Sequence, residues 1–142
     1  MTDNDTRTVM EGYLGALLGG TGFERFFAPD VVWTTMETGE EVRGREAVRD
    51  LIVGLHSQVF DAHPELVNLV CGEGVAAIEA VFDGVQTGEF AGVPPNGAHV
   101  RVPYAMAYDV AGGVITALRG YMPMTTLRAQ CEGAAGTAVQ AG

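Results

Sequence analysis

The sequence has no lysine, only two cysteines and no long apolar run. All eight basic residues are arginines, against 18 acidic residues, so the formal net charge is −10. A chain without lysine cannot form a Schiff base with a carbonyl substrate. Strong acidity with scattered arginines argues against binding to nucleic acid or to an anionic membrane. No apolar stretch reaches the ~20 residues of a membrane-spanning helix, and the N-terminus lacks the apolar segment of an export signal. We therefore expect a cytoplasmic protein.

The sequence also lacks the usual signatures of metal and cofactor sites. Cys71 and Cys131 do not stand in metal-binding or redox spacing, and His56 and His63 have no carboxylate at ligand spacing. No glycine-rich phosphate loop follows a predicted strand, and no serine or cysteine stands in a nucleophile-elbow motif. We therefore predict neither a metal nor a cofactor.

What is present is one domain of 142 residues, 47% hydrophobic, which is long enough to bury a core. Apolar residues recur at helical spacing in the first part of the chain and alternate with a period of two after Pro64. The predicted helices cover residues 9–18, 22–27 and 44–59, and the predicted strands cover 30–37, 66–71, 75–86, 99–110 and 114–122. Helices followed by an antiparallel meander predict an α+β fold in which the helices cover one face of a curved sheet. We assign residues 1–130 to this domain and expect the Gly/Ala-rich residues 131–142 to form a disordered tail.

Four phrases in order, "FAPDVVW", "VRGREAV", "TGEFAGVPPNG" and "GGVITALRGYMP", resemble the SnoaL-like polyketide cyclase family of the NTF2-like superfamily. That superfamily also contains ketosteroid isomerase and limonene-1,2-epoxide hydrolase. The resemblance implies a cone-shaped α+β barrel, with three N-terminal helices packed on a curved, mainly antiparallel sheet around a conical pocket. It places the "TGEFAGVPPNG" hairpin at the rim of that pocket, where Pro94, Pro95 and the Asn96-Gly97 pair interrupt strand pairing.

The resemblance also indicates where catalytic groups should stand, and most of those positions are replaced here. The base of ketosteroid isomerase corresponds to Thr35 and its protonated aspartate to Ala105. The last aspartate of the epoxide hydrolase corresponds to Gly120, and an aspartate of the cyclases to Pro123. Only Tyr13, at the position of the oxyanion tyrosine of the isomerase, is kept.

The same correspondences predict which strand residues face the pocket. We take Glu79 and Tyr13 as catalytic candidates, because a carboxylate buried among apolar residues suits general acid or base chemistry and a tyrosine can stabilise an oxyanion. Glu79 could instead face solvent or pair with Arg119. The predicted ligand-binding residues are Trp33, Thr35, His56, Phe60, Val81, Asp83, Ala105, Leu118, Gly120 and Met122. The strand residues predicted to face away from the pocket are apolar enough to predict a homodimer interface. They are Ile78, Phe82, Tyr104, Met106, Tyr108, Arg119 and Tyr121.

Three functional hypotheses remain open. The first is an enzyme with cyclase-like or isomerase-like proton transfer on a small hydrophobic oxygenated molecule. The second is a protein that binds such a molecule without catalysis. The third is a dimeric interaction module. Replacement of the catalytic acids favours the second hypothesis, whereas retention of Tyr13 and of the rim hairpin favours the first.

Overall fold

The computed structural model describes residues 2–20 and 22–141. In chain order the elements are α1 (Asp3–Gly19), the 3₁₀ turn η1 (Phe23–Phe26), β1 (Phe27–Thr35), β2 (Glu40–Arg43), α2 (Arg45–Val53), the π-helical turn η2 (Gly54–Val59), β3 (Phe60–Ala62), β4 (Glu65–Gly72), β5 (Val75–Gln86), β6 (His99–Ala111), β7 (Val114–Tyr121) and α3 (Met124–Ala141). None of the described helices is long and apolar enough to cross a membrane.

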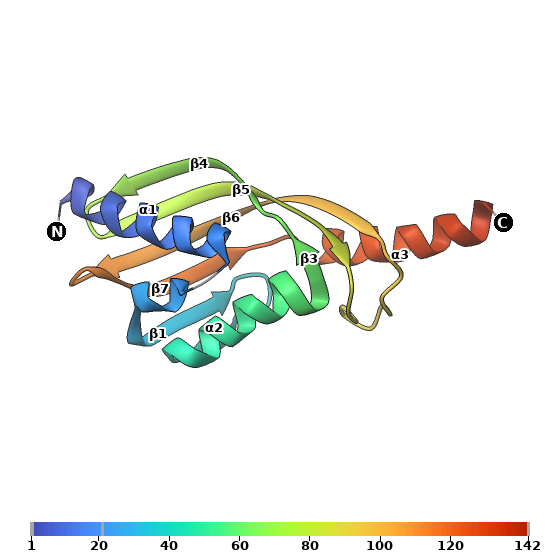
Figure 1. Cartoon of the computed structure of the whole chain (residues 1–142), viewed down its shortest axis with the longest axis horizontal. Coiled ribbons are helices and arrows are strands. Elements are labelled where there is room, and N and C mark those ends of the chain that lie inside the picture. Colours follow the sequence, from blue (N-terminus) through green and yellow to red (C-terminus); the bar gives the residue numbers. More distant parts are fainter. Residues whose placement is uncertain (1, 21, 142) are drawn as a thin grey trace.

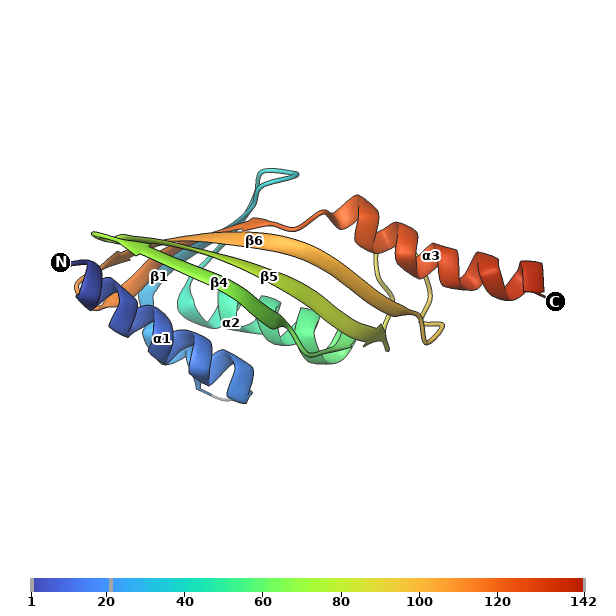
Figure 2. The ribbon, with the colours of Figure 1, turned by 90° about the horizontal axis from the view of Figure 1, so that it is seen from above.

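The strands form one sheet in the order β2-β1-β7-β6-β5-β3, and β4 pairs with β5 on its own. The β4–β7 pairs are antiparallel, whereas β1 runs parallel to β7. Figures 1 and 2 show α1 and α2 on the same side of the curved sheet, with the other side largely bare of helices. We call the side that carries α1 and α2 the inner face, and the other side the outer face. This arrangement confirms the predicted α+β fold with a mainly antiparallel meander.

Helix α1 is set by signals at both of its ends. The Thr2 side chain accepts a hydrogen bond from the Asp5 backbone, and the Asp5 side chain accepts one from the Thr2 backbone. This capping box explains why the helix begins earlier than the apolar spacing predicts. Gly20, in the left-handed conformation at φ 87°, ends it. Met10 and Tyr13 are buried on the side that packs against the sheet.

A second group of buried residues lies at the far end of the sheet, under the rim hairpin. Phe60, Phe82 and Phe90 pack together, and the Phe60 ring centroid lies 5.3 Å from each of the other two. The buried Gln86 side chain donates to the carbonyls of Gly88 (3.0 Å) and Val93 (2.8 Å), which holds the hairpin against this cluster. The rim hairpin is therefore anchored to the domain.

Helix α3 covers the C-terminal segment, where the sequence pattern indicated no helix. Residues from Cys131, expected to be a disordered tail, continue α3 as far as Ala141, and Cys131 itself is buried. The Gln130 side chain forms two hydrogen bonds with the backbone of Arg101. Its Oε1 accepts from the Arg101 N–H at 2.8 Å, and its Nε2 donates to the Arg101 carbonyl at 3.0 Å, so it takes the place of a neighbouring strand. Glu37 accepts from the Met124 backbone at 3.0 Å and so caps the start of α3. These contacts join residues that are far apart in the sequence, so local composition could not reveal them.

Candidate functional site

The structure reverses the predicted facing of β5 and β6. On β5 the buried residues are Ala76, Ile78, Ala80 and Phe82, which face the inner side, whereas Ala77, Glu79 and Val81 point to the outer side. Met106 pairs with Ile78 on one side and with Gly120 on the other, so the three share the inner face. Leu118 and Gly120 lie on the inner face, as predicted, whereas Met122 lines both the inner cavity and the outer groove. Because side chains alternate, a shift of one residue in the family correspondences moves every β5 and β6 side chain to the wrong face.

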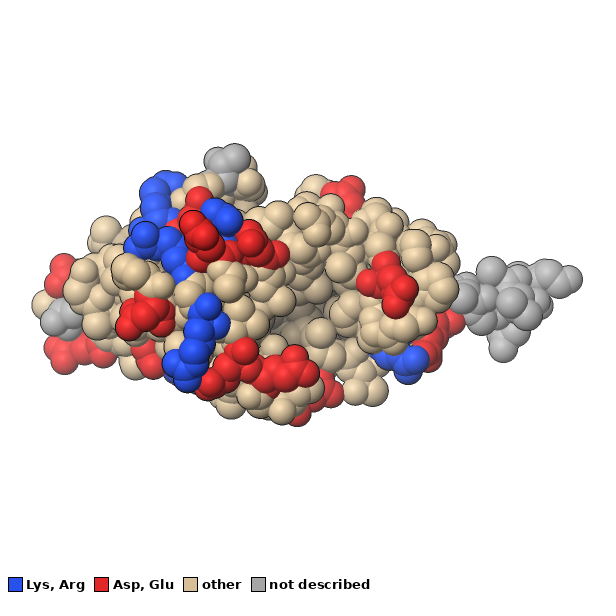
Figure 3. Space-filling model, turned by 90° about the horizontal axis from the view of Figure 1, so that it is seen from below, with Lys and Arg blue, Asp and Glu red and all other residues tan. Residues whose placement is uncertain are grey.

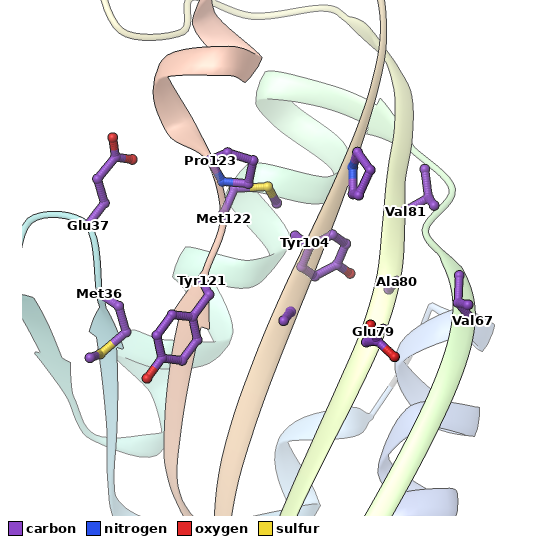
Figure 4. A pocket seen from close by; sticks show the side chains of 12 residues that line it. Met36, Glu37, Val67, Glu79, Ala80, Val81, Tyr104, Tyr121, Met122 and Pro123 are labelled. Carbon is purple, nitrogen blue, oxygen red and sulfur yellow. The ribbon is translucent and has the colours of Figure 1, made fainter.

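Glu79 is therefore wrongly predicted as a buried catalytic acid. It is exposed on the outer face, and its Oε1 accepts from Asn68 Nδ2 at 3.3 Å. Arg119 is paired with Asp109 through two 3.0 Å hydrogen bonds instead. Figure 4 shows Glu79 and Val67 projecting from neighbouring strands into an open outer groove of about 760 Å³. A carboxylate in this position is solvated.

Three predicted ligand-binding residues also lie outside the inner cavity because of the same reversal. Val81 and Ala105 line the outer groove. Asp83 belongs to a surface ion-pair group, in which it accepts from Arg101 at 2.6 Å and lies 2.9 Å from His99 Nε2. These hydrogen bonds lower the pKa of Asp83.

A partly open cavity of about 130 Å³ lies between α1, α2, η2 and the inner face of the sheet. The predicted site residues that line it are Tyr13, Trp33, Thr35, His56, Gly120 and Met122. Two other predicted residues, Phe60 and Leu118, are fully buried and belong to the two packed cores rather than to the cavity wall. The remaining lining residues are Leu17, Leu51, Ile52, Leu55, Ile78, Tyr104, Met106, Tyr108 and Met124.

Sequence reasoning missed Tyr104, Met106 and Tyr108, and it assigned them to a dimer interface. A signal for them was present in residues 99–111. The even-numbered positions of this strand are all large and apolar, from Val100 to Val110, whereas the odd-numbered positions are small, charged or proline. Such alternation by itself identifies the buried face of a strand. It should have taken precedence over the family correspondence.

Three tyrosines, Tyr13, Tyr104 and Tyr108, line this cavity. The rings of Tyr13 and Tyr108 lie 5.9 Å apart, and Tyr13, Tyr104 and Tyr108 interact electrostatically with one another. Burial raises the pKa of Tyr104 to about 12 and raises the pKa values of Tyr13 and Tyr108 as well. All three hydroxyls consequently stay protonated at neutral pH and can act as hydrogen-bond donors.

His56 is the one other titratable side chain in the described lining of the cavity. It stands on the π-helical turn η2, a feature that is often found at functional sites. Its ring centroid lies 5.8 Å from that of Phe82. Burial lowers the pKa of His56 to about 4, so its imidazole is neutral at physiological pH.

Trp33 is fixed by its neighbours on two strands. Its Nε1 donates to Thr35 Oγ1 at 3.0 Å. Gly120 leaves room for the indole, since a Cβ added there would lie only 3.2 Å from Trp33 Cζ2. The residue at the position of the isomerase base, Thr35, therefore orients the tryptophan here.

The cavity is suited to a small, neutral molecule. The lining given above contains no carboxylate, lysine or arginine, so it offers no charge to bind an ion. An apolar cavity of about 150 Å³ can hold benzene, so a space of similar size accepts a molecule of about one ring. The tyrosine hydroxyls could donate hydrogen bonds to an oxygen atom of that molecule.

Comparison with known proteins agrees with this architecture. A proposed SnoaL-like polyketide cyclase from Jannaschia sp. CCS1 superposes with a TM-score of 0.79 at 19% identity, covering 92% of each chain. A proposed polyketide cyclase from Xanthomonas campestris pv. campestris gives 0.77 at 21% identity, over 91% of this chain and 98% of that one. A proposed ketosteroid isomerase from Kribbella flavida gives 0.67 at 20% identity, over 87% and 82%. At these identities the likeness concerns the fold.

No curated protein matches the sequence. Residues 19–118 match the SnoaL-like domain. This stretch is more than half of the chain and runs from the end of α1 into β7, so it includes most of the cavity wall. The chain therefore belongs to the family of SnoaL-like domains.

Proposed function

We propose that the inner cavity binds a small neutral carbonyl compound of about one ring and catalyses a cyclase- or isomerase-type proton transfer on it. The observation that carries this proposal is the presence of three protonated tyrosine hydroxyls and one neutral imidazole in a single apolar cavity. Tyr13 and Tyr104, which both line the cavity, would donate to the carbonyl oxygen. Their hydrogen bonds would strengthen as negative charge develops on that oxygen. His56 would accept the proton from the adjacent carbon.

The low pKa of His56 sets a condition on this role. An imidazole whose pKa is about 4 is a weak base when nothing else is bound. In the apolar cavity, however, the imidazolium would form next to an enolate, and attraction between opposite charges is strong at low local dielectric. The neutral base form predominates above pH 5, so the rate should be flat there and should fall as pH drops through about 4.

A second candidate function is binding without catalysis. It is favoured by the absence of a carboxylate from the described cavity wall, which leaves His56 as the lone candidate base beside the tyrosines. The two functions share the ligand and differ in whether a proton is moved. An exchange experiment separates them.

Cyclohexanone in D₂O provides that experiment, because it combines one ring with an exchangeable α-proton. Trp33, the one tryptophan of the chain, lines the cavity and reports binding by fluorescence. We expect a saturable change in Trp33 emission and deuterium incorporation, followed by NMR, above the rate in buffer. Binding with no excess exchange would select the second function, and a lack of binding would contradict both.

We also propose that a second copy of the chain covers the outer face. The residues predicted for a dimer interface were partly wrong, since Tyr104, Met106 and Tyr108 line the inner cavity. The outer face still exposes a group of large apolar side chains: Val67 (66% exposed), Val70 (57%), Val75 (51%) and Tyr121 (49%). Exposed apolar groups of this kind mark interaction sites. Figure 3 shows the distribution of charge on one face of the molecule. On that face basic side chains lie beside acidic ones, and no extended basic patch forms.

Light scattering tests this pairing. We expect a mass twice the 14.9 kDa of the chain at micromolar concentration. Val70→Arg should shift the protein toward the single-chain mass, because an isologous interface would bring both arginines into the contact. Ala47→Arg, an exposed position on α2, is the matched control and should leave the mass unchanged. A single-chain mass for the wild type would refute the pairing.

A further inference from the structure

A second cleft, of about 440 Å³, adjoins the inner cavity. It lies between the end of α1, the α2–η2 segment and the turn from β3 to β4. Leu17, Ile52 and His56 line both spaces. The two spaces are therefore neighbours across these side chains, and His56 stands between them.

The walls of the cleft are apolar and partly exposed. Leu18 is 50% exposed and Val53 is 37% exposed, while Phe23 is buried behind them. Neither Leu18 nor Val53 lines the inner cavity, so a ligand bound only in that cavity would leave both side chains exposed. An aliphatic chain lying along the cleft would remove both from water.

Asp61 is the one carboxylate in the described lining of the cleft, which also contains His56 and His63. Asp61 stands at its rim, with an exposed side chain that lies 3.4 Å from His63 Nε2. The C-terminal end of α1, which carries partial negative charge, forms another wall and has no basic residue in its last turn. The described lining contains no arginine. Asp61 and the end of α1 together favour an ammonium group over a carboxylate or a phosphate.

We propose that the cleft is the outer half of the binding site and that the substrate is elongated. Its neutral ring fills the inner cavity, and an aliphatic tail passes His56 into the cleft and ends in an ammonium group at Asp61. The size of the inner cavity supports this division, since about 130 Å³ is small beside the roughly 300–1,000 Å³ of common ligand pockets. This inference rests on the proposed function, because it extends the same ligand.

Four probes test it, with dissociation constants measured from Trp33 fluorescence. They are cyclohexanone and three cyclohexanones with a five-carbon chain at C4, ending in a methyl, an ammonium or a carboxylate group. A fully buried methylene strengthens binding by about fourfold, so the methyl-ended chain should gain at least about tenfold over cyclohexanone. The ammonium end should bind more tightly than the carboxylate end by about threefold, as expected for an ion pair with an exposed carboxylate. Asp61→Asn should reduce this difference.

Val53→Asp supplies the test of location. It should remove most of the gain from the methyl-ended chain and leave the affinity for cyclohexanone unchanged. Ala47→Asp is the control, because Ala47 is also exposed on α2 and lines neither space. If cyclohexanone binds but the chains add nothing, or if their gain survives Val53→Asp, the inference is overturned and the proposed function stands. If no probe binds, with or without a chain, both are contradicted.

Discussion

His56→Gln is expected to lower the rate of α-proton exchange by at least about 100-fold, the lower end of the range for loss of a general base. Glutamine keeps the polarity and approximate size of the side chain but cannot accept a proton at this strength. The affinity for cyclohexanone should change little, because the tyrosine hydroxyls remain. NMR of deuterium incorporation, at ketone concentrations that saturate the Trp33 signal, measures the rate apart from binding.

Two companion variants show whether this loss is specific. Tyr13→Phe removes one hydroxyl and should slow exchange by about 100-fold, as the loss of one oxyanion donor does in other enzymes. Glu79→Gln should leave the rate unchanged, because Glu79 is exposed on the outer face. Exchange that survives in His56→Gln, or disappears in Glu79→Gln, would contradict the proposed mechanism.

The second large effect concerns stability in acid. Unfolded His56 would titrate near its ordinary pKa of about 6.5, whereas burial in the folded protein lowers that pKa to about 4. The unfolded state therefore binds the proton first, so the free energy of unfolding falls as pH drops from 6.5 to 4. The contribution of His56 to this loss is about 3 kcal/mol, at about 1.4 kcal/mol per pH unit.

Urea unfolding of the wild type and of His56→Gln at several pH values between 7 and 4 measures this effect. The variant should lose about 3 kcal/mol less than the wild type over this range. The surface pairs of Asp83 and Glu65 with Arg101 also weaken in acid, because Arg101 lowers the pKa values of both acids. They are present in both proteins, so their contribution cancels. His63→Gln, at an exposed position, should follow the wild type. If the free energy of unfolding falls by the same amount with pH in the wild type and in His56→Gln, then His56 is not buried in solution.

The fold was predictable wherever the pattern was local. The helical spacing from Val9 to Leu18 and the period-two segments after Pro64 correspond to α1 and to the β4–β7 meander. The four-residue strand β2 and the three-residue strand β3 were missed, since short strands carry little periodicity. Helix α3 was missed because its composition is rich in glycine and alanine, while its docking depends on distant partners such as Glu37.

The site was predictable only in part, and the failures have one physical origin. Tyr13 and His56 were found because helical or turn positions near the cavity tolerate a small error in the family correspondence. Glu79 and Ala105 were misplaced because the same error on a strand turns a side chain through the sheet. The two residues are direct partners in the β5–β6 ladder, so a single shift carried both to the wrong face.

We infer that the ligand binds on the inner face of the sheet. Intermolecular NOEs between cyclohexanone and methyl-labelled protein test it most directly. Met106 and Ile78 line the inner cavity alone, whereas Val67 and Val81 line the outer groove alone. The structure predicts NOEs from the ketone to the methyl groups of Met106 and Ile78. NOEs to Val67 and Val81 in their place would contradict the account and would make the outer groove the binding site.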